Sequence, residues 1–428
     1  MLSLTGRAPH QGHFTSDHLP LARGFDSFFG FYSGYIDYFS HESGGLLLAG
    51  GKAHPSAVTT LFARHASEIR MCSRPDCYLD WQDSREGPQA ASGEYGTIEL
   101  SAVVDDVIRR HDSDTPFFLY YAVPNVHEPL MAPDHIFAAH SRVLDKIPNT
   151  QRRTFAAMLV MLDETVANVT HSLRTAGMYE RTILVFASDN GANALVQGSG
   201  SNFPLRGQKG YLFEGGFRVP AFIHSPLIPQ DRRGASYENL FHVSDWLPTL
   251  LDGVLDRASL LAGRSLNGVN HWNALLGSST SIPRSEILYN IDMLGDTGKP
   301  LGFDVAAVRV DKWKLILNEL NVSSYPVPVA DVVMQNRVPN NGEAGDVRHN
   351  YLFDLDKDPG ETTNLYDAQP DVVRNLTTTL TLYRNRMVDC VYCSMSDNAS
   401  YVAWDELGGF VGPWRESGDL TCRGSMGR

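Results

Sequence analysis

The stretch TFAAMLVMLDETVANVTHSLRTAGMYERTILVFASDNGA, residues 154–192, decides the fold class of this chain. Its apolar residues recur at spacings of three and four as far as Gly177, which predicts an amphipathic helix that ends at this glycine. The run TILVFA (182–187) is rich in β-branched residues and leads into a polar turn, which predicts a buried strand. The apolar positions of the helix are Phe155, Met158, Leu159, Leu162, Val166, Val169 and Leu173.

A second buried strand is predicted upstream of that helix. DTPFFLYYAVPNVHEPL (114–130) is an apolar, aromatic-rich run followed by a loop that carries His127. The order strand, helix, strand is typical of an α/β fold, a mostly parallel sheet flanked by helices. Ligands of such folds gather at the carboxyl ends of the strands, where His127 and the pair Asp189-Asn190 both fall.

The pattern changes beyond about residue 280. EILYNI (286–291), AAVRVDKWKLILN (306–318) and NYLFDLDKDP (350–359) have the character of antiparallel strands, and a helical pattern follows them. We therefore expect a large α/β domain over residues 1–280. A smaller C-terminal α+β domain, built from an antiparallel sheet and a helix, is expected over residues 281–428.

Charge and hydropathy limit the possible partners. The chain has 36 Lys and Arg against 49 Asp and Glu, a formal net charge of −13, which disfavours nucleic acid and anionic membranes. No apolar run approaches the roughly 20 residues that cross a bilayer. The first 20 residues also lack the basic start and apolar centre of a secretory signal, so a soluble chain without an export signal is expected.

Two features favour the secretory pathway instead. Four Asn-X-Ser/Thr triplets are candidate glycosylation sites, and two close cysteine pairs are candidate disulfides. An odd fifth cysteine, Cys422, has no evident partner in the sequence. The glycosylation candidates are Asn168, Asn321, Asn375 and Asn398, and the paired cysteines are Cys72, Cys77, Cys390 and Cys393.

Asp189-Asn190-Gly191 is the first local signal for chemistry. A carboxylate and a carboxamide at the end of a buried strand present two hard oxygen ligands, which suit Ca²⁺ or Mg²⁺ better than zinc. Gly191 allows the backbone to turn sharply behind them. An ordinary Asx turn is the alternative explanation for these three residues.

A basic, glycine-rich segment follows in NFPLRGQKGYLFEGGFRVP (202–220). Arg206, Lys209 and Arg218 lie among glycines that permit close backbone approach, which favours an oxyanion site in an otherwise acidic chain. A solvated loop is the alternative. His127 is able to donate a proton to a leaving oxygen or to bind an anion, although a structural histidine has the same sequence signature.

Several blocks of sequence, taken together, resemble the sulfatase family, most closely its arylsulfatase B-like members that act on N-acetylgalactosamine 4-sulfate. The blocks keep the family order from about residue 10 to residue 414. The resemblance implies an alkaline-phosphatase-like fold, a sulfated glycan or aryl sulfate ester as substrate, and a lysosomal or extracellular location. The blocks are RGFDSFFGFYSGYIDYFSH, VHEPL, FASDNGA, PLRGQKGYLFEGGFRVP, HVSDWLPTL, LFDLDKDPGETTNL and GFVGPW.

The resemblance also implies roles for individual residues. Asp189 and Asn190 match ligands of the family's single Ca²⁺ ion, and Lys209 matches the lysine that bridges to the substrate sulfate. His127 matches the histidine that contacts the sulfate ester and serves the leaving group. The tetrapeptide PHQG (9–12) is similar to the end of the family's G-K-W-H-x-G block, which makes His10 the match for a catalytic histidine.

The chain departs from the family pattern at its amino terminus. Sulfatases have paired aspartates that complete the calcium site and a C-x-P-S-R motif whose cysteine becomes the formylglycine nucleophile. Neither is found in these residues, and Ala8 stands where the family has a lysine. Because grouped catalytic residues act together, we expect this polypeptide as written to be inactive or nearly so.

Three alternatives remain at this point. The chain could be a non-catalytic protein that binds sulfated glycans through Lys209, His127 and Arg206. It could be a phosphodiesterase or phosphatase of the same superfamily, although the His residues after Asp189 have no metal-ligand spacing. It could also be an incomplete gene model of an ordinary sulfatase. The sequence leaves the oligomeric state open.

The stretch EIRMCSRPDCYLD (68–80) contains the residue types of the C-x-P-S-R motif in another order. It follows the RGFD block, whereas the family's nucleophile precedes it, so Cys72 is not the displaced nucleophile. A zinc site is poorly supported because no second Cys or His pair lies nearby. A small loop closed by a disulfide between Cys72 and Cys77 is the expected role.

Overall fold

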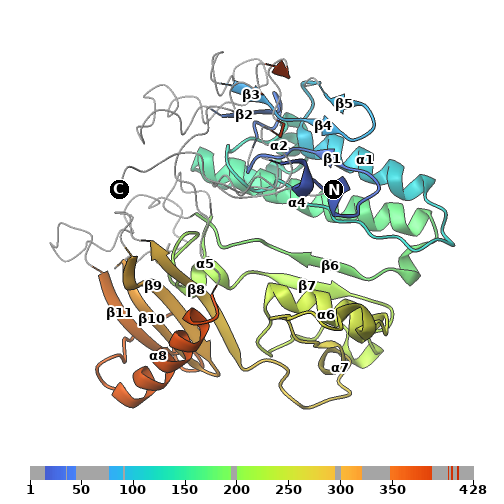
Figure 1. Ribbon diagram of the computed structural model, residues 1–428. Helices are drawn as coiled ribbons and strands as arrows, with labels where there is room; N and C mark the ends of the chain where they lie inside the picture. The colour runs from blue at the N-terminus through green and yellow to red at the C-terminus, as the bar shows by residue number, and fades with distance from the viewer. Residues whose placement is uncertain are drawn as a thin grey trace. The chain divides into compact units, whose positions relative to one another are not determined.

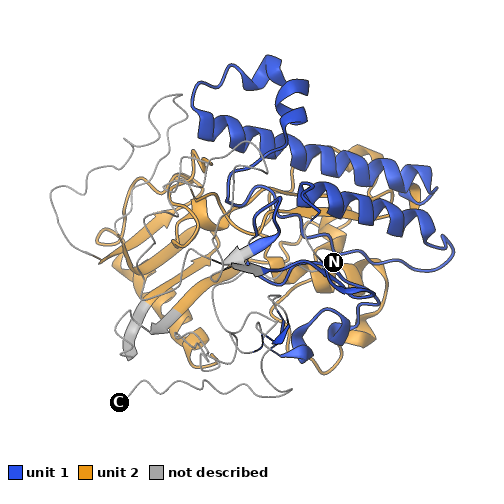
Figure 2. Cartoon of the chain, turned by 90° about the horizontal axis from the view of Figure 1, so that it is seen from above, with its two compact units in different colours: residues 1–179, 389–428 blue, residues 180–388 orange. Residues whose placement is uncertain are grey.

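A computed structural model describes most of the chain, and two compact units make up its fold (Figures 1 and 2). Unit 1 comprises residues 1–179 and 389–428, and unit 2 comprises residues 180–388. The boundary between the units differs from the domain boundary expected near residue 280, which stays a prediction. The structure describes residues 15–34, 36–44, 77–89, 92–193, 200–294, 300–320, 348–387, 403, 406–407 and 412–413.

Two long helices carry the core of unit 1. The predicted helix is present as α4, Thr150–Thr175, and Asn149 caps it by accepting a hydrogen bond from the Arg152 N–H. It ends where expected, because Gly177 has φ +67° and the following N–H returns to Leu173 O at 2.9 Å. The other long helix is α1, Gly96–Arg110, whose buried Leu100, Val104 and Ile108 recur every fourth residue.

Short elements complete unit 1. The buried side chains around α4 include Met158 and Met161, whereas Leu159, predicted on the apolar face, is 45% exposed. The helices α2 (Asp134–Ala139) and α3 (Ser141–Leu144) pack beside α4. The strands pair in the order β1-β4-β5 and β2-β3. They are β1 (Phe29–Gly30), β2 (Glu42–Gly44), β3 (Cys77–Leu79), β4 (Gln82–Asp83) and β5 (Gly87–Pro88), and the 3-10 turns are Ser16–His18, Leu21–Arg23 and, at the boundary with unit 2, Tyr179–Arg181.

Unit 2 begins with a two-stranded ribbon. The predicted strand is β6, Leu184–Ala187, and it pairs with β7, Ala221–His224. It was expected to be buried, but its residues are half-buried or exposed in the described structure, with Val185 36% exposed. Short helices lie between β6 and a four-stranded sheet further along the chain. They are α5 (Glu214–Phe217), α6 (Trp246–Pro248), a π-helical turn (Thr249–Val254), α7 (Trp272–Leu275) and the 3-10 turns Gln230–Arg232, Val243–Asp245 and Ala258–Leu261.

The antiparallel sheet and helix predicted for the C-terminal region are confirmed. The strands β8 (Glu286–Leu294), β9 (Pro300–Val310), β10 (Trp313–Leu320) and β11 (Arg348–Asp354) lie in the order β11-β10-β9-β8. Every neighbouring pair is antiparallel. Helix α8 (Pro370–Arg384) covers one face of this sheet (Figure 1).

The two faces of β10 have different partners. Leu315 and Leu317 point to the face that packs against Leu376 and Leu380 of α8. Ile316 points to the opposite face and joins a cluster with Leu212, Phe213 and Phe353, so residues from the glycine-rich segment cover that side. Strand alternation thus gives each face of the sheet its own apolar layer.

One aspect of the expected fold is corrected for the described residues. All strand pairs described there are antiparallel, including β6 with β7, and residues 117–124, expected to form a buried strand, are assigned no strand. The chain folds back after β6, as the hydrogen bond from Ser188 N–H to Pro220 O shows, so its sheet neighbour is the next strand in sequence. A local apolar run predicts a strand but cannot name its partner.

Candidate functional site

The Asp189-Asn190-Gly191 turn directly follows β6. The carboxylate of Asp189 is exposed, and its Oδ1 accepts the Asn190 N–H at 2.8 Å. The Asn190 amide donates through Nδ2 to Gly191 O at 2.9 Å, which fixes the orientation of the carboxamide. Its Oδ1 is therefore presented as an acceptor, so the turn offers two hard oxygens.

The glycine-rich segment that carries Lys209 lies against this turn. Gly191 N–H donates to Gly216 O at 3.0 Å, and Lys209 N–H donates to Ala192 O at 3.3 Å. Asn202 completes the connection, because its Oδ1 accepts Ala192 N–H at 2.8 Å and its Nδ2 donates to Ala192 O at 2.9 Å. The structure thus brings the backbone of Lys209 next to the turn that bears Asp189 and Asn190.

Glycine is required where these two segments meet. A Cβ atom on Gly191 would lie 1.7 Å from Gly215 O, and a Cβ on Gly215 would lie 2.5 Å from Arg206 O. No side chain fits at such separations, so both positions need a residue without Cβ. The glycines of this segment therefore serve close packing, in agreement with the expectation that they permit close backbone approach.

The structure corrects the predicted role of Arg206 as a recognition residue. Arg206 is only 7% exposed, and its guanidinium carbon lies 4.1 Å from the centroid of the Phe213 ring and 5.1 Å from that of Tyr351. Its Nη1 donates to Glu361 O at 3.0 Å. A guanidinium enclosed in this way supports the loop from beneath and cannot form part of an exposed recognition patch. Arg218, in contrast, is exposed.

His127 belongs to unit 1. Its Nδ1 lies 2.7 Å from Glu128 O, and because a carbonyl oxygen only accepts, Nδ1 carries the proton. Backbone contacts hold the loop, since His127 N–H donates to Pro124 O and the Tyr38 hydroxyl donates to His127 O at 3.0 Å. The buried Tyr38 is therefore a support that the sequence pattern did not reveal.

A buried ionic network lies beneath the Lys209 segment. Lys314 of β10 is fully buried, with its Nζ 2.8 Å from Glu214 Oε1 and 2.9 Å from Glu361 Oε1. The Tyr289 hydroxyl donates to Glu214 Oε1 at 2.6 Å, and Glu214 N–H donates to Glu361 Oε2 at 2.6 Å. Sequence reasoning missed this network. Its one local signal was a lysine inside the apolar strand KLIL.

The charges in this network shift the pKa of both carboxyl groups. Burial alone would raise the pKa of Glu214, but the Lys314 ammonium and the Tyr289 hydrogen bond outweigh it and lower that pKa. Burial raises the pKa of Glu361, and Lys314 offsets this only in part. The two glutamates thus share one lysine unequally, with Glu214 the more acidic.

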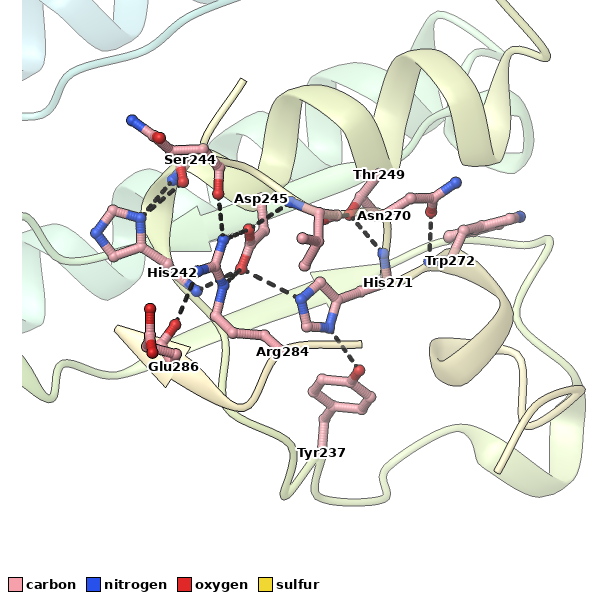
Figure 3. Close-up of polar contacts among 12 residues, drawn as sticks. Tyr237, His242, Ser244, Asp245, Thr249, Asn270, His271, Trp272, Arg284 and Glu286 are labelled. Carbon is pink, nitrogen blue, oxygen red and sulfur yellow. Dashed lines mark hydrogen bonds and ion pairs between the residues drawn. The ribbon is translucent and has the colours of Figure 1, made fainter. Parts of the chain in front are cut away.

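A second polar cluster surrounds Asp245 (Figure 3). Arg284 forms a two-pronged contact with the Asp245 carboxylate, at 2.8 and 2.5 Å. His271 Nε2 lies 3.2 Å from Asp245 Oδ2, and its Nδ1 lies 2.7 Å from the Tyr237 hydroxyl. Burial opposes ionisation of Asp245, yet the His271 and Arg284 contacts lower its pKa.

The cluster around Asp245 has a structural explanation. Asp245 Oδ2 also accepts His242 N–H at 2.7 Å, while His242 Nδ1 accepts Ser244 N–H at 3.2 Å, which forms a capping box. The residue that caps this turn is thus His242. The contacts of Asp245 with Val269, His271 and Arg284 link segments of unit 2 that are distant in sequence.

Several predicted site residues lie outside the described part of the chain, and for one of them only the backbone is described. Asn168 on α4 and Asn375 on α8 are exposed, as a glycan acceptor requires, and both remain predictions. Within the described ranges, no group of three His, Cys, Asp or Glu side chains is arranged to hold a metal ion. The residues outside the description are His10, Cys72, the side chain of Cys77, Cys390, Cys393, Asn321 and Asn398.

Comparison with known families places the chain. The family described as Sulfatase matches residues 8–254, more than half of the sequence. The chain belongs to the sulfatase family. The matched region contains both segments of the candidate site, the turn at Asp189 and the loop of Lys209. The described helices of this chain include none that is both long and apolar enough to cross a membrane.

Relatives agree with the family assignment. Arylsulfatase J of Mus musculus is 31% identical over 422 residues, which cover 95% of this sulfatase chain and 63% of the relative. Arylsulfatase A of Homo sapiens is 30% identical over 275 residues, covering 61% of the chain and 48% of the relative. The chain thus spans less than two thirds of the length of either relative.

A solved structure agrees with the fold. Ps i-CgsB in complex with k-i-k-neocarrahexaose has a TM-score of 0.60 with this chain and is 22% identical. The alignment covers 91% of this chain and 73% of that one. The alkaline-phosphatase-like fold class implied by the sequence is therefore confirmed, with the difference in described strand pairing noted above.

Proposed function

We propose that this protein is a sulfuric ester hydrolase of the arylsulfatase type, and that the loop of Lys209 binds the sulfate group. The observation that carries this proposal is the direct hydrogen bonding between the Lys209 segment and the Asp189-Asn190 turn. That contact lies within one compact unit and joins the backbone of the segment that carries the Lys209 cation to the turn that bears two hard oxygen ligands. A sulfate ester needs both kinds of group, a positive charge and a metal ligand set.

Each residue has a separate role in the proposed reaction. The Lys209 ammonium would bind a sulfate oxygen and offset the negative charge of the ester. His127 in its imidazolium form would donate the Nε2 proton to the leaving alcohol oxygen, since Nδ1 is committed to Glu128 O. His10 is proposed as a further catalytic histidine by its position in the family motif.

Asp189 and Asn190 are proposed to supply two ligands to a calcium ion. Carboxylate and carboxamide oxygens fit calcium in kind, and the hydrogen bond from Asn190 Nδ2 turns the amide oxygen outward. Calcium takes six to eight oxygens, so these two residues form only part of its ligand set. When bound, the ion would supply positive charge that stabilises the sulfate oxygens.

The substrate class is proposed from the subgroup resemblance. A sulfated galactosamine glycan of the N-acetylgalactosamine 4-sulfate type is the expected natural ester. A lysosomal or extracellular location, N-glycans at exposed sequons such as Asn168 and Asn375, and disulfides at the cysteine pairs are proposed with it. The 428 residues contain no C-x-P-S-R motif, so we propose that this polypeptide by itself turns over sulfate esters slowly or not at all.

A second candidate is a non-catalytic protein that binds sulfated glycans. The observation in its favour is that backbone hydrogen bonds and buried charges of unit 2 support the Lys209 loop. This support does not depend on a catalytic nucleophile. Burial of Arg206 restricts the proposed recognition residues to Lys209 and His127.

Two measurements on the same protein test these proposals. Isothermal calorimetry with inorganic sulfate should show binding that Lys209→Ala abolishes, whereas Arg257→Ala, which removes one exposed charge elsewhere in unit 2, should leave it unchanged. Equal binding by Lys209→Ala and the parent chain would contradict the assignment of the loop.

Hydrolysis of an aryl sulfate in the presence of calcium then separates the two functions. Saturable binding of chondroitin 4-sulfate fragments without sulfate release agrees with the binding protein. Turnover at ordinary enzyme rates would overturn the prediction that this polypeptide is impaired.

A further inference from the structure

The antiparallel sheet of unit 2 holds the Lys209 loop at two points. Leu212 N–H donates to Glu319 Oε2 at 2.8 Å, and Glu214, two residues further along, is bound by Lys314. Both partners belong to the same strand, β10. The loop residues that they bind, Leu212 and Glu214, follow Lys209 by only three and five residues. Strand β10 therefore fixes the chain immediately beside the lysine that is proposed to bind sulfate.

A β-bulge makes this double contact possible. Lys314 and Ile316 share the face of β10 that meets the loop, and strict alternation would turn Glu319 to the face of Leu315 and Leu317. The register with β11 shifts between Ile316 and Glu319, and Asn318 has φ +57°. The extra residue reverses the alternation, which places Glu319 on the same face as Lys314.

Both contacts are buried. Lys314 is fully buried and Glu319 is 4% exposed, and burial raises the pKa of the Glu319 carboxyl. Buried hydrogen bonds of this kind specify a single geometry, because any displacement leaves a polar group without a partner. Leu212 and Phe213 add an apolar contact to the same sheet face.

We propose that Glu319 and Lys314 are positioning residues for sulfate binding, and that the C-terminal sheet sets the position of Lys209. This inference rests on the proposed role of Lys209 in binding sulfate. Neither residue contacts the ester. Each acts through the loop, Glu319 through the Leu212 N–H and Lys314 through the Glu214 carboxylate.

Calorimetry with inorganic sulfate on the full chain is the test, with three variants of β10. Glu319→Leu removes the acceptor for Leu212 N–H, and we expect the Kd for sulfate to rise about tenfold or more. Glu319→Gln keeps one carbonyl oxygen that accepts this N–H, so it should restore the Kd to within about threefold of the parent value. Leu315→Ala, on the opposite face, destabilises the same strand but should leave the Kd within about threefold.

A second readout follows Lys209 itself. Acetylation of lysines by acetic anhydride, measured by mass spectrometry with Lys312 as the internal reference, should change at Lys209 in Glu319→Leu and not in Leu315→Ala. A merely structural role predicts that both variants change labelling and affinity in proportion to their loss of stability. If Glu319→Leu does not fold, Glu319→Ala, which leaves room for water, takes its place in the same comparison.

The outcomes distinguish the inference from the function on which it depends. If the parent chain binds sulfate and Lys209→Ala does not, the proposed site stands. Glu319→Leu with the affinity of the parent chain, or Leu315→Ala with the same loss as Glu319→Leu, would then overturn the positioning role alone. If Lys209→Ala binds as well as the parent chain, the site itself is wrong and the inference fails with it.

Discussion

Replacement of Lys314 by methionine should destabilise unit 2 severely. The substitution keeps an unbranched side chain but removes the only ammonium described between Glu214 and Glu361, whose carboxylates lie 2.8 and 2.9 Å from Nζ. Loss of one partner from a buried ion pair costs about 3–5 kcal/mol, because the remaining charge is left without compensation. Here two carboxylates remain, so the upper part of that range is expected.

The magnitude is large relative to the stability of a domain. Folded domains are stable by about 5–15 kcal/mol, so Lys314→Met should remove a third or more of the free energy of unfolding. Urea denaturation followed by tryptophan fluorescence measures this, since Trp246, Trp272 and Trp313 all lie in unit 2. A lower denaturation midpoint with an unchanged slope is the expected result.

Two further variants make the reasoning refutable. Lys312→Met removes a lysine two residues away whose side chain is 38% exposed and pairs with Asp354, and it should have a much smaller effect. The triple variant Lys314→Met, Glu214→Gln, Glu361→Gln removes all three charges and should recover much of the loss. Equal midpoints for Lys314→Met and Lys312→Met would show that the buried network does not stabilise the unit.

Three other predictions concern pH, packing and the second cluster. Because the pKa of Glu361 is raised above its ordinary value of 4.5, its contribution to stability is complete below that value and is lost as pH rises through the raised pKa. Glu361→Gln should therefore reduce the difference in unfolding free energy between about pH 5 and about pH 7.5, measured by urea denaturation. Gly191→Ala should cost about 1–3 kcal/mol and weaken sulfate binding in calorimetry, because its Cβ would lie 1.7 Å from Gly215 O. Arg284→Met should cost about 3 kcal/mol in thermal or urea unfolding, since Asp245 is buried and would keep His271 as its one side-chain hydrogen-bond partner among the contacts described; a loss no larger than that of Arg257→Ala would count against it.

Local patterns in the sequence predicted one long helix and the strands of the C-terminal sheet. The helix α4 and the strands β8 to β11 were found because apolar spacing follows from the geometry of each element by itself. The same reasoning misjudged pairing. TILVFA was predicted as a strand and is one, but its partner β7 runs antiparallel to it, and residues 117–124 are assigned no strand in the described structure.

The residues of the candidate site were also predicted in part correctly and in part wrongly. The residue types and the family motifs drew attention to Asp189, Asn190 and Lys209, which lie on segments that the structure joins by hydrogen bonds. The family assignment predicted from these blocks is confirmed by the match over residues 8–254. Arg206 was wrongly placed among the recognition residues because the sequence carries no information about the rings that enclose it.

The sequence by itself determined the family, the helix α4, the strands of the C-terminal sheet, and the residues with the chemistry to bind a sulfate and a metal ion. Only the tertiary structure decided that Lys314 and Glu319 hold the Lys209 loop, because those contacts join positions about 100 residues apart. The bulge at Asn318 turns Glu319 to the face of Lys314, and no period-two pattern predicts such a reversal. Contacts between distant segments depend on how faces pack together, and a linear pattern records only which residues each face contains.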